Sequence, residues 1–364
     1  MACSEHPASS ANADYTNTTD KNDRAITVRA FQNTSCDTQR WEDFISRPPD
    51  ADADIFHSIR VRNIINATMP NCRCFYRMAF CGSPDNREQD LVGISPLVHV
   101  SHLLFSSRLV SPAFFVYGGL LSSSIVAQNK RLCDAENIAK ALSVLYIENE
   151  GKGLPCGHWP VMPLTHVFFR KAIEEESQAR FLNIPRKRPA DVRKAIEGGL
   201  TFCVTENVQV FYDLYSKSMH KHGTPVHAKS WYERIMSGFG LDCRILVAQD
   251  RKNPIAALMA FFFRGIVYPY YMGSVVSARE MRGMDFLYWK LMEFSIECGG
   301  SGAYMYKKHW GFTPQPVYYQ CFSEDAIHLA SRHSFYQRWG SKLWKILPLA
   351  MTKRFGHLFA RGIA

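Results

Sequence analysis

Hydrophobic and polar positions change their spacing several times along this 364-residue chain, and each change marks an expected element. The segment "ITVRAF" at 26–31 has the two-residue period of a strand. Three later segments, "CFYRMAF", "LVGISPLVHV" and "PAFFVYGGLL", combine β-branched and aromatic residues between Gly, Pro, Asp and Ser. We expect them to be strands of one sheet, with "THVFFRKAI" as a further strand of the first half.

Helical spacing appears between these strands. Helices are expected near 40–46 and 57–66. A third helix is expected where four apolar residues share one helical face, namely Ile138, Leu142, Leu145 and Tyr146. The first half is therefore predicted to be mixed α/β.

The same succession begins again after a polar and basic bridge at 174–199. The pattern there predicts a strand, two helices, three strands and a long helix, at 200–204, 208–220, 229–238, "CRILVAQD", "PIAALMAFFFR", "IVYPYYMG" and 283–298. Two halves with one succession indicate a duplicated domain.

Composition agrees with a folded chain long enough for two domains, since 46% of its residues are hydrophobic and 21% are charged. The net charge is 43 − 33 = +10, and the stretch from Arg332 to Ala364 has seven basic residues and no acidic one. We expect that end to favour an anionic partner. Its last part, 342–364, is predicted either to pack as a helix on the first half or to lie on an anionic membrane surface.

The cellular setting is predicted from what the chain contains. Residues 1–25 lack the basic patch and apolar stretch of a secretory signal, so we expect a disordered extension. The longest apolar run, at 255–263, is too short to span a bilayer. Eleven cysteines without an export signal favour free thiols in a reducing cytoplasm. Cys72, Cys74 and Cys81 have no second ligand pair at zinc spacing, so we interpret them as buried thiols and expect no metal.

Three stretches have residue types that could bind an anionic substrate. Arg279, Arg282 and Gly283 lead directly into a helix, whose free backbone N–H groups favour phosphate. A second stretch carries five cations around two prolines, namely Arg186, Lys187, Arg188, Arg193 and Lys194. A third mixes rings with cations, namely Tyr304, Tyr306, Lys307, Lys308 and Trp310. Each stretch also has an interpretation without a ligand. The first could be a solvated turn, the second a solvated linker and the third an ordinary edge strand.

Several segments, taken in order, resemble the FemAB-related proteins associated with exosortase/PEP-CTERM systems, within the wider FemABX and GNAT acyltransferase superfamily. They are "FVYGGLL", "NIPRKRPADVRKAIEGGL", "FYDLYSKSMHKHGTPVHAKSWYE", "PYYMGS", "RGMDFLYWKLME" and "GAYMYKKHWGFTPQPVYYQ". The resemblance implies an α/β (α+β) fold of tandem GNAT-like domains with mixed central sheets. The first domain is expected at 26–180, completed by 317–364, and the second at 181–316.

The resemblance also implies site residues. The basic stretch of the family falls on Arg186, Lys187, Arg193 and Lys194, and its phosphate-side turn on Arg282 and Gly283, beside Arg279. Its Phe-Lys-Lys-x-Trp-Gly pattern falls on Tyr306, Lys307, Lys308, Trp310 and Gly311, with tyrosine in place of phenylalanine. Tyr117 and Tyr271, in two further matching segments, are expected at the substrate.

The implied reaction is transfer of an acyl or aminoacyl group to an amine, from acyl-CoA or from an aminoacyl-tRNA. Lys307 is expected beside the acyl donor or the developing oxyanion, and Asp285 and Tyr304 are candidate proton acceptors. The implied acceptor is a nucleotide- or lipid-linked glycan or peptide of cell-envelope or exopolysaccharide synthesis, met in the cytoplasm or at the inner face of the membrane. A non-catalytic FemAB-like binding protein and a tRNA-dependent peptidyltransferase acting on a peptidoglycan precursor are the alternatives.

A short segment at 299–302, "GGSG", departs from the family's pattern. Relatives usually carry another strand there, close to Phe-Asp-Phe-Gly-Arg-Ser, whereas four residues reach at most ~14 Å. We expect that strand to be missing and its neighbour, "IVYPYYMG", to have an unpaired edge. "MEFSIEC" just before the gap alternates as a strand would. We nevertheless expect a helix, because apolar residues at helical spacing run through this segment and glycines follow it. These apolar residues are Leu287, Leu291, Phe294 and Cys298.

Overall fold

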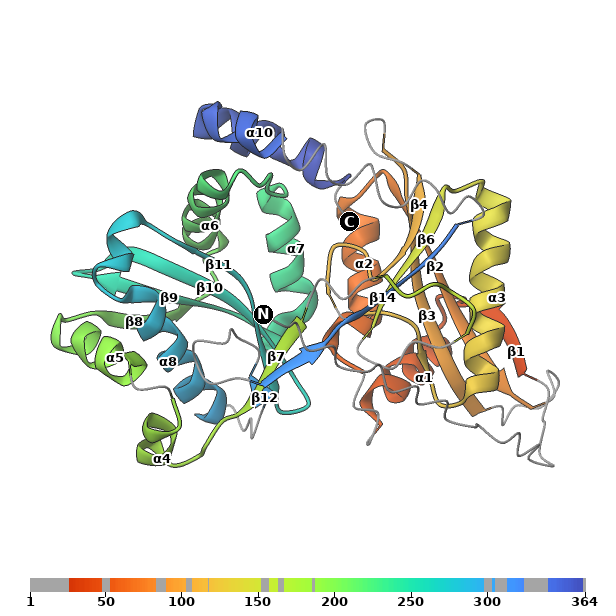
Figure 1. The fold of residues 1–364 in the computed structure, drawn as a ribbon, viewed down its shortest axis with the longest axis horizontal. Coiled ribbons are helices and arrows are strands. Elements are labelled where there is room, and N and C mark those ends of the chain that lie inside the picture. The colour runs from red at the N-terminus through yellow and green to blue at the C-terminus, as the bar shows by residue number, and fades with distance from the viewer. Residues whose placement is uncertain are drawn as a thin grey trace, which may run out of the picture.

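The computed structural model describes residues 26–47, 53–82, 90–102, 107–116, 118–151, 157–162, 167–184, 187–297, 303–304, 313–323 and 340–362. In these residues the chain forms two seven-stranded sheets, each flanked by helices (Figure 1). Both sheets contain parallel and antiparallel neighbours. The fold is therefore mixed α/β, as the hydrophobic pattern predicts.

The first sheet has the order β1-β2-β3-β4-β6-β14, with β5 paired to β3. Its neighbours are antiparallel except β4 and β6, which run parallel. The strands are β1 (Ile26–Ala30), β2 (Cys72–Cys81), β3 (Asp90–Val100), β4 (Arg108–Ser111), β5 (Leu121–Ser122), β6 (Tyr146–Gly151) and β14 (Tyr318–Phe322).

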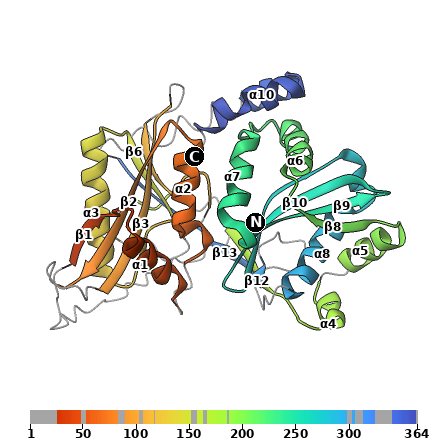
Figure 2. The same ribbon diagram turned by 180° about the vertical axis from the view of Figure 1, so that it is seen from behind.

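Helices cover both faces of this sheet (Figures 1 and 2). On one face, Leu132 of α3 (Ile125–Leu142) packs in a core with Leu97 and Leu109. The other face is covered by α1 (Ser35–Ser46) and α2 (Ile59–Thr68). The short helix η1 (Ile55–His57) lies between them in the chain and directly precedes α2. Successive strand residues therefore enter different cores, as a pleated strand requires.

Two local predictions for this half are wrong. Helix α3 ends at Leu142 because Ser143 takes a left-handed conformation with φ of 50°, and Tyr146 instead begins β6. The segment "PAFFVYGGLL" does not form the expected strand. Its first residue, Pro112, has no N–H to donate to a sheet ladder, and of its described residues only Leu121 lies in a strand.

The second sheet has the order β13-β7-β12-β11-β10-β9-β8. Leu246 and Leu258 point into the core under one pair of helices, whereas Ile245 and Met259 point into the core that reaches the first half. The strands are β7 (Val167–Ala172), β8 (Thr201–Thr205), β9 (Cys243–Asp250), β10 (Asn253–Phe263), β11 (Ile266–Ser274), β12 (Ala303–Tyr304) and β13 (Thr313–Pro316).

Two pairs of helices enclose this sheet. One face is covered by α5 (Lys187–Glu197) and α8 (Gly283–Glu297), and the other by α6 (Val208–His222) and α7 (Lys229–Phe239) (Figure 1). Further described helices are α4 (Ser177–Leu182), η2 (Gly240–Asp242), η3 (Val276–Arg279) and α10 (Leu349–Ala360), and residues 340–346 are also helical. The preference for a helix at "MEFSIEC" is confirmed, because α8 continues to Glu297.

The chain passes between the two sheets more than once. Strand β7 pairs with β12 and β13 in the second sheet, and β14 returns to pair with β6 in the first. The expected boundaries at 180/181 and 316/317 stay predictions, and residues 1–25 lie outside the described part. No helix among the described residues has the length and apolarity needed to cross a bilayer.

One hydrophobic core joins the two halves. Phe56 of η1 is 1% exposed, and its ring lies 5.3 Å from that of Phe261 in β10 and 5.0 Å from that of Tyr270 in β11. Phe115 lies on its other side, stacked at 5.1 Å, and also contacts Trp231 of α7. An aromatic side chain of the first half is thus buried against the second sheet.

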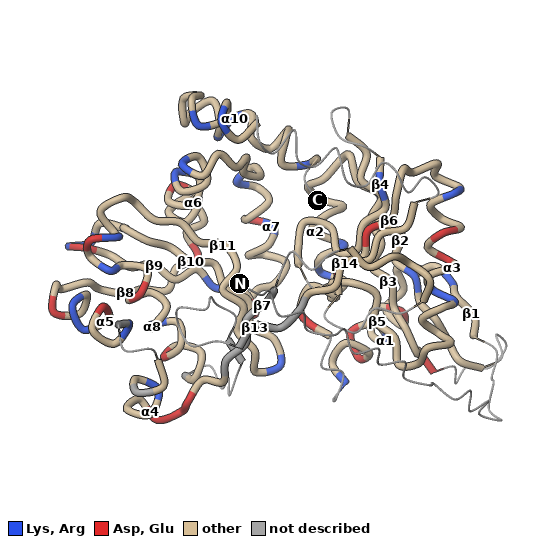
Figure 3. The backbone as a smooth tube through the Cα atoms, viewed as in Figure 1, with Lys and Arg blue, Asp and Glu red and all other residues tan. Residues whose placement is uncertain are grey.

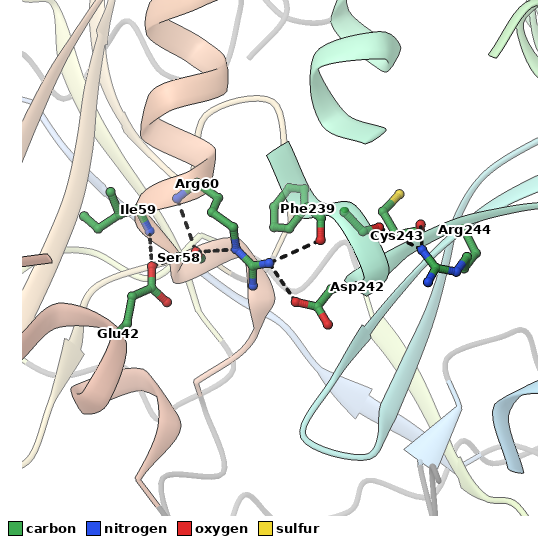
Figure 4. A network of polar contacts seen from close by, with 9 residues as sticks. Glu42, Ser58, Ile59, Arg60, Phe239, Asp242, Cys243 and Arg244 are labelled. Atoms are coloured by element: carbon green, nitrogen blue, oxygen red, sulfur yellow. Dashed lines mark hydrogen bonds and ion pairs between the residues drawn. The ribbon is translucent and has the colours of Figure 1, made fainter. Parts of the chain in front are cut away.

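Polar contacts at the edge of this core connect the same elements (Figure 4). Arg60 of α2 donates to Asp242 Oδ2 of the second half at 2.7 Å and to the Phe239 carbonyl at 3.4 Å. Within the first half, Ser58 Oγ donates to Glu42 of α1 at 2.8 Å. Because the Arg60–Asp242 pair is partly exposed, it orients the halves more than it stabilises them.

We expect Phe56→Ala to lower the free energy of unfolding by about 3–5 kcal/mol, because it leaves a cavity that both halves line. Urea denaturation followed by circular dichroism and by tryptophan fluorescence should show one transition shifted to lower urea. Phe44→Ala is the matched control, since Phe44 is buried in the same core but lies in α1 of the first half. Two separate transitions in the wild-type protein would contradict a shared core.

Candidate functional site

The sequence-predicted site residues fall into two groups. Tyr117, Arg186, Tyr306, Lys307, Lys308 and Trp310 lie outside the described residues. Of Lys187 in α5 and Tyr304 in β12, only the backbone is described. The rest are described and lie in the second half, namely Arg193, Lys194, Tyr271, Arg279, Arg282, Gly283 and Asp285. The roles assigned to all of them stay predictions.

The turn between β11 and α8 brings backbone donors together. Arg282 takes a left-handed conformation with φ of 58°, and its carbonyl accepts the helical bond from Phe286 N at 3.0 Å. The N–H groups of Gly283, Met284 and Asp285 therefore have no partner inside the helix. Together with the helix dipole they give this end of α8 a partial positive charge.

Gly283 is required by packing at this turn. A Cβ atom there would lie 3.0 Å from Ile255 Cδ1 of β10 and 3.4 Å from Ala278 of η3. The missing side chain lets the start of α8 lie close to the sheet, which explains the glycine without any ligand.

Charged side chains of α5 meet the start of α8. Arg188 donates to Asp285 Oδ1 at 2.7 Å, and Arg282 Nε lies 3.1 Å from Asp191 Oδ1. Arg188 also approaches Asp191 at 3.4 Å. We call these four residues the ion quartet. Asp191 did not enter the sequence-based site, because nothing in the pattern indicated that α5 and α8 pack together.

Asp285 has a displaced pKa in this quartet. Burial raises the pKa of its carboxyl group and the nearby carboxylate of Asp191 raises it further, while Arg188 and Arg282 act in the opposite direction. The net direction is upward, so the carboxyl group holds its proton to a higher pH than an ordinary aspartate. A proton acceptor needs such tuning, but the bond to Arg188 occupies one of the Asp285 oxygens.

The basic residues of the bridge do not converge on this turn. Arg193 and Lys194 are exposed on α5, and the Arg193 guanidinium lies 5.1 Å from the ring of Phe181 in α4. Arg279 is exposed at the end of η3. Only Arg188 and Arg282, among the described arginines named here, belong to the quartet.

Strand β11 carries a bulge that the sequence analysis missed. Met259 of β10 pairs with Tyr271, whereas the next residue, Ala260, pairs with Pro269, so Tyr270 is an extra residue in the ladder. Such a bulge bends the strand locally and re-aims the side chain of the extra residue. Pro269, which cannot donate a ladder bond, is the only sequence signal for it.

Strand β12 is the neighbour of β11 on its outer edge. Among the described residues, β12 runs parallel to β11 and pairs with it at Val267 and Tyr304. The predicted loss of a strand at 299–302 stays a prediction, because those residues and 305–312 lie outside the described part.

Tyr271 is enclosed by other aromatic side chains. Its ring lies 5.3 Å from that of Tyr232 and 5.5 Å from that of Tyr215, and its hydroxyl accepts from Trp231 Nε1 at 3.4 Å. Burial raises the pKa of the Tyr271 hydroxyl well above its ordinary value, so this group stays protonated. The described contacts make Tyr271 part of the core behind β11.

Comparisons with known proteins agree with this geometry. Residues 186–307 match the sequence profile described as an acetyltransferase (GNAT) domain, which covers α5 to β12. The structure of FemX is similar with a TM-score of 0.57 at 13% identity, over 88% of this chain and 94% of that one. A tandem GNAT protein from the clavulanic acid biosynthesis pathway is similar with a TM-score of 0.51 at 9% identity, over 82% of this chain and 98% of that one. Curated protein sequences gave no match.

At these identities the structural similarity shows the fold. The expected fold class, tandem GNAT-like domains with mixed sheets, is confirmed. In the second half, residues 186–307 match a GNAT acetyltransferase profile, in agreement with the resemblance. The start of α8, the bulge and the ion quartet all lie within that matching stretch.

A histidine between α6 and α7 lies mostly buried near the junction of the halves. His227 packs 5.0 Å from Trp231 and 5.5 Å from Phe114, and its Nδ1 atom is buried without a hydrogen bond to a described residue. Burial lowers the pKa of His227 to about 3, and the positive charges of Arg361 and His357 lower it further. The folded protein therefore keeps this ring neutral.

We expect the stability of the protein to fall as pH falls from about 6.5 towards about 4, by about 1.4 kcal/mol per pH unit from His227. The unfolded chain binds a proton in this window and the folded chain does not. His227→Leu should flatten the slope of unfolding free energy against pH, measured by urea denaturation. His222→Leu, at the exposed end of α6, is the control. An unchanged slope in His227→Leu would refute the burial of a neutral ring.

Proposed function

We propose that the protein is an N-acyltransferase that carries an acyl group from a thioester to an amine. The proposal rests on one observation. Within the stretch matching a GNAT domain, the bulged strand β11 is followed, after the short helix η3, by the start of α8, where three backbone N–H groups have no partner inside the helix and Arg282 lies beside them. Such a helix start favours phosphate.

Acyl-CoA is the proposed donor. Its pyrophosphate would lie at the start of α8 near Arg279 and Arg282, and its pantetheine arm would follow the outer edge of β11. Asp191 currently neutralises Arg282, so phosphate oxygens would replace a carboxylate there. This exchange keeps the arginine paired throughout binding, which avoids the cost of leaving a charge unpaired.

The transfer itself needs a neutral amine aligned with the thioester carbon. The amine nitrogen attacks that carbon, the carbonyl oxygen becomes an oxyanion, and collapse expels the coenzyme A thiolate, while the amine loses a proton. The side chain of Lys307 is the proposed oxyanion donor. Asp285 and Tyr304 are the proposed proton acceptors.

The acceptor is proposed to be an amine on a nucleotide- or lipid-linked glycan or peptide, in cell-envelope or exopolysaccharide synthesis on the cytoplasmic side. This follows the sequence resemblance to FemAB-related proteins of exosortase/PEP-CTERM systems. The predicted substrate residues with rings or cations for such a ligand are Tyr117, Arg186, Lys187, Arg193, Lys194, Tyr306, Lys308 and Trp310. Tyr271, also predicted at the substrate, is instead buried in the core behind β11.

A non-catalytic binding protein is the second candidate. The sequence at 299–302, "GGSG", favours it, because relatives usually carry another strand there that would hold one wall of a donor site. An aminoacyl-tRNA donor, with transfer to a peptidoglycan precursor, is a variant of the enzyme proposal. It would bind with a steep dependence on salt, since RNA binding releases counterions.

We expect acyl-CoA and free coenzyme A to bind saturably, with micromolar dissociation constants, in a titration of tryptophan fluorescence. Trp289 in α8 is a suitable reporter close to the proposed site. Arg282→Gln should weaken binding about ten-fold by removing one charged contact, and Asp191→Asn should strengthen it by removing a competing carboxylate. Arg234→Gln, on the exposed side of α7, is the control.

The alternatives predict different titrations. A protein that binds no acyl donor but binds an envelope precursor would support the non-catalytic scaffold. Binding of tRNA that weakens steeply with salt would support the aminoacyl donor. Equal binding of acyl-CoA by the wild-type protein and by Arg282→Gln would contradict the proposed position of the phosphate at the start of α8.

We expect Lys307→Ala to lower the rate of acyl transfer by about 100-fold or more, because an oxyanion contact is lost in the transition state. The rate is measured as release of coenzyme A thiol from acyl-CoA in the presence of candidate amines. Circular dichroism and urea denaturation should show an unchanged fold. Undiminished turnover would contradict the role given to Lys307.

A further inference from the structure

Helix α10 holds an apolar stripe towards solvent. Met351, Phe355 and Leu358 are 45%, 43% and 48% exposed, and their spacing places them on one side of the helix. Figures 1 and 2 show α10 on the outside of the molecule, beyond α6. The stripe therefore belongs to a regular helix whose apolar side chains face solvent.

The opposite side of α10 fixes the helix on the protein. Thr352, Gly356 and Ala360 are buried, and a Cβ atom at Gly356 would lie 2.9 Å from the carbonyl oxygen of Val226. Lys353 forms an ion pair with Asp213 of α6. The helix therefore presents its exposed side in one orientation.

The C-terminal end of α10 is tied to the first half. Asn71 Nδ2 donates to the Arg361 carbonyl at 3.0 Å, and Arg108 donates to the Gly362 carbonyl at 2.8 Å. The helix therefore contacts both halves. Of the two placements predicted from the sequence, packing on the first half is only part of the arrangement, since α6 belongs to the second.

The helical turns at 340–346, just before α10, also expose apolar side chains. Leu343 and Ile346 are 63% and 80% exposed. Between them Trp344 is buried, with its ring 5.3 Å from that of Phe359 in α10. Five exposed apolar side chains thus lie within sixteen consecutive residues, from Leu343 to Leu358.

Charge on these two helical segments has one sign. Residues 340–362 contain five basic residues and no acidic one, and Figure 3 shows no acidic residue on α10. Lys342, Lys345 and Arg354 are exposed. Arg354 lies one turn from both Met351 and Leu358, so it flanks the stripe.

We propose that this surface, made of 340–346 and the exposed side of α10, docks the protein on anionic phospholipid. An amphipathic helix with cations beside its apolar face lies in the plane of such a membrane, with the apolar side chains among the acyl chains and the cations at the headgroups. At twelve residues, α10 is too short to span a bilayer. The inference does not depend on acyl transfer, since the start of α8 takes no part in it.

Charge argues against a second copy of this chain as the occupant. A two-fold contact would place the same surface on both partners and bring Lys345 and Arg354 against their own copies. No acidic residue of 340–362 is available to pair them. Anionic headgroups supply the missing opposite charge.

The test is co-sedimentation of the full chain with vesicles of phosphatidylglycerol and phosphatidylcholine, compared with phosphatidylcholine alone. The wild-type protein should bind the anionic vesicles, less at high salt. Phe355→Ser with Leu358→Ser should lower the partition coefficient about ten-fold or more. Lys345→Gln with Arg354→Gln should lower it about 30-fold, from roughly 1 kcal/mol for each cation.

Matched controls lie elsewhere on the surface. Leu241 and Ile125 are 81% and 58% exposed, so Leu241→Ser with Ile125→Ser removes exposed apolar area away from α10. Lys130→Gln with Arg234→Gln removes two exposed cations. Both pairs should bind vesicles as the wild type does.

Three outcomes would overturn the proposal. One is no binding by the wild-type protein, and another is equal binding to neutral and anionic vesicles. The third is a dimer in light scattering that Phe355→Ser with Leu358→Ser dissociates, which would assign the surface to a second copy. Because each readout is binding to lipid or self-association, failure here leaves the acyl-donor titration unaffected.

Discussion

The arrangement of the whole molecule depends on the burial of Phe56 against the second sheet. This ring comes from a short helix of the first half and contacts Phe261 and Tyr270, which lie in adjacent strands of the second. Removing such a side chain from water stabilises a fold by about 1.5–3 kcal/mol, more than the partly exposed Arg60–Asp242 pair contributes. The halves are consequently held in one relative position by apolar area, with the polar contacts setting register.

That position matters for the candidate site, because Tyr270 belongs to both structures. It is the extra residue of the bulge in β11, and its ring packs on Phe56 and Phe115 of the first half. The first half thereby supports the strand beside which the donor is proposed to lie. The first half therefore has a structural role at this bulge, whether or not it binds a ligand itself.

The sequence predicted the elements better than their contacts. Alternation along β9 and β10 and the helical stripe of α8 are local patterns, so the strands, the helix to Glu297 and the GNAT-like class could be predicted. The end of α3 at Ser143 could not, because a left-handed serine has no distinctive signature. The partners of Arg282 and Asp285 depend on α5 packing beside α8, about 95 residues apart along the chain. A periodic pattern within one element cannot show which distant element packs beside it, so Asp191 was missed. The roles of Lys307 and Tyr306 remain predictions.

The ion quartet has a consequence for how the protein responds to ionic strength. Its two arginines and two aspartates carry equal and opposite charge, so this part of the surface is locally neutral although the chain has a net charge of +10. A phosphate bound at Arg282, as we propose, would displace a carboxylate fixed to the same protein and would release no dissolved anion. The entropy gained from counterion release would then be small, and the site would discriminate by shape and hydrogen bonding, whereas a bare basic patch would attract any polyanion.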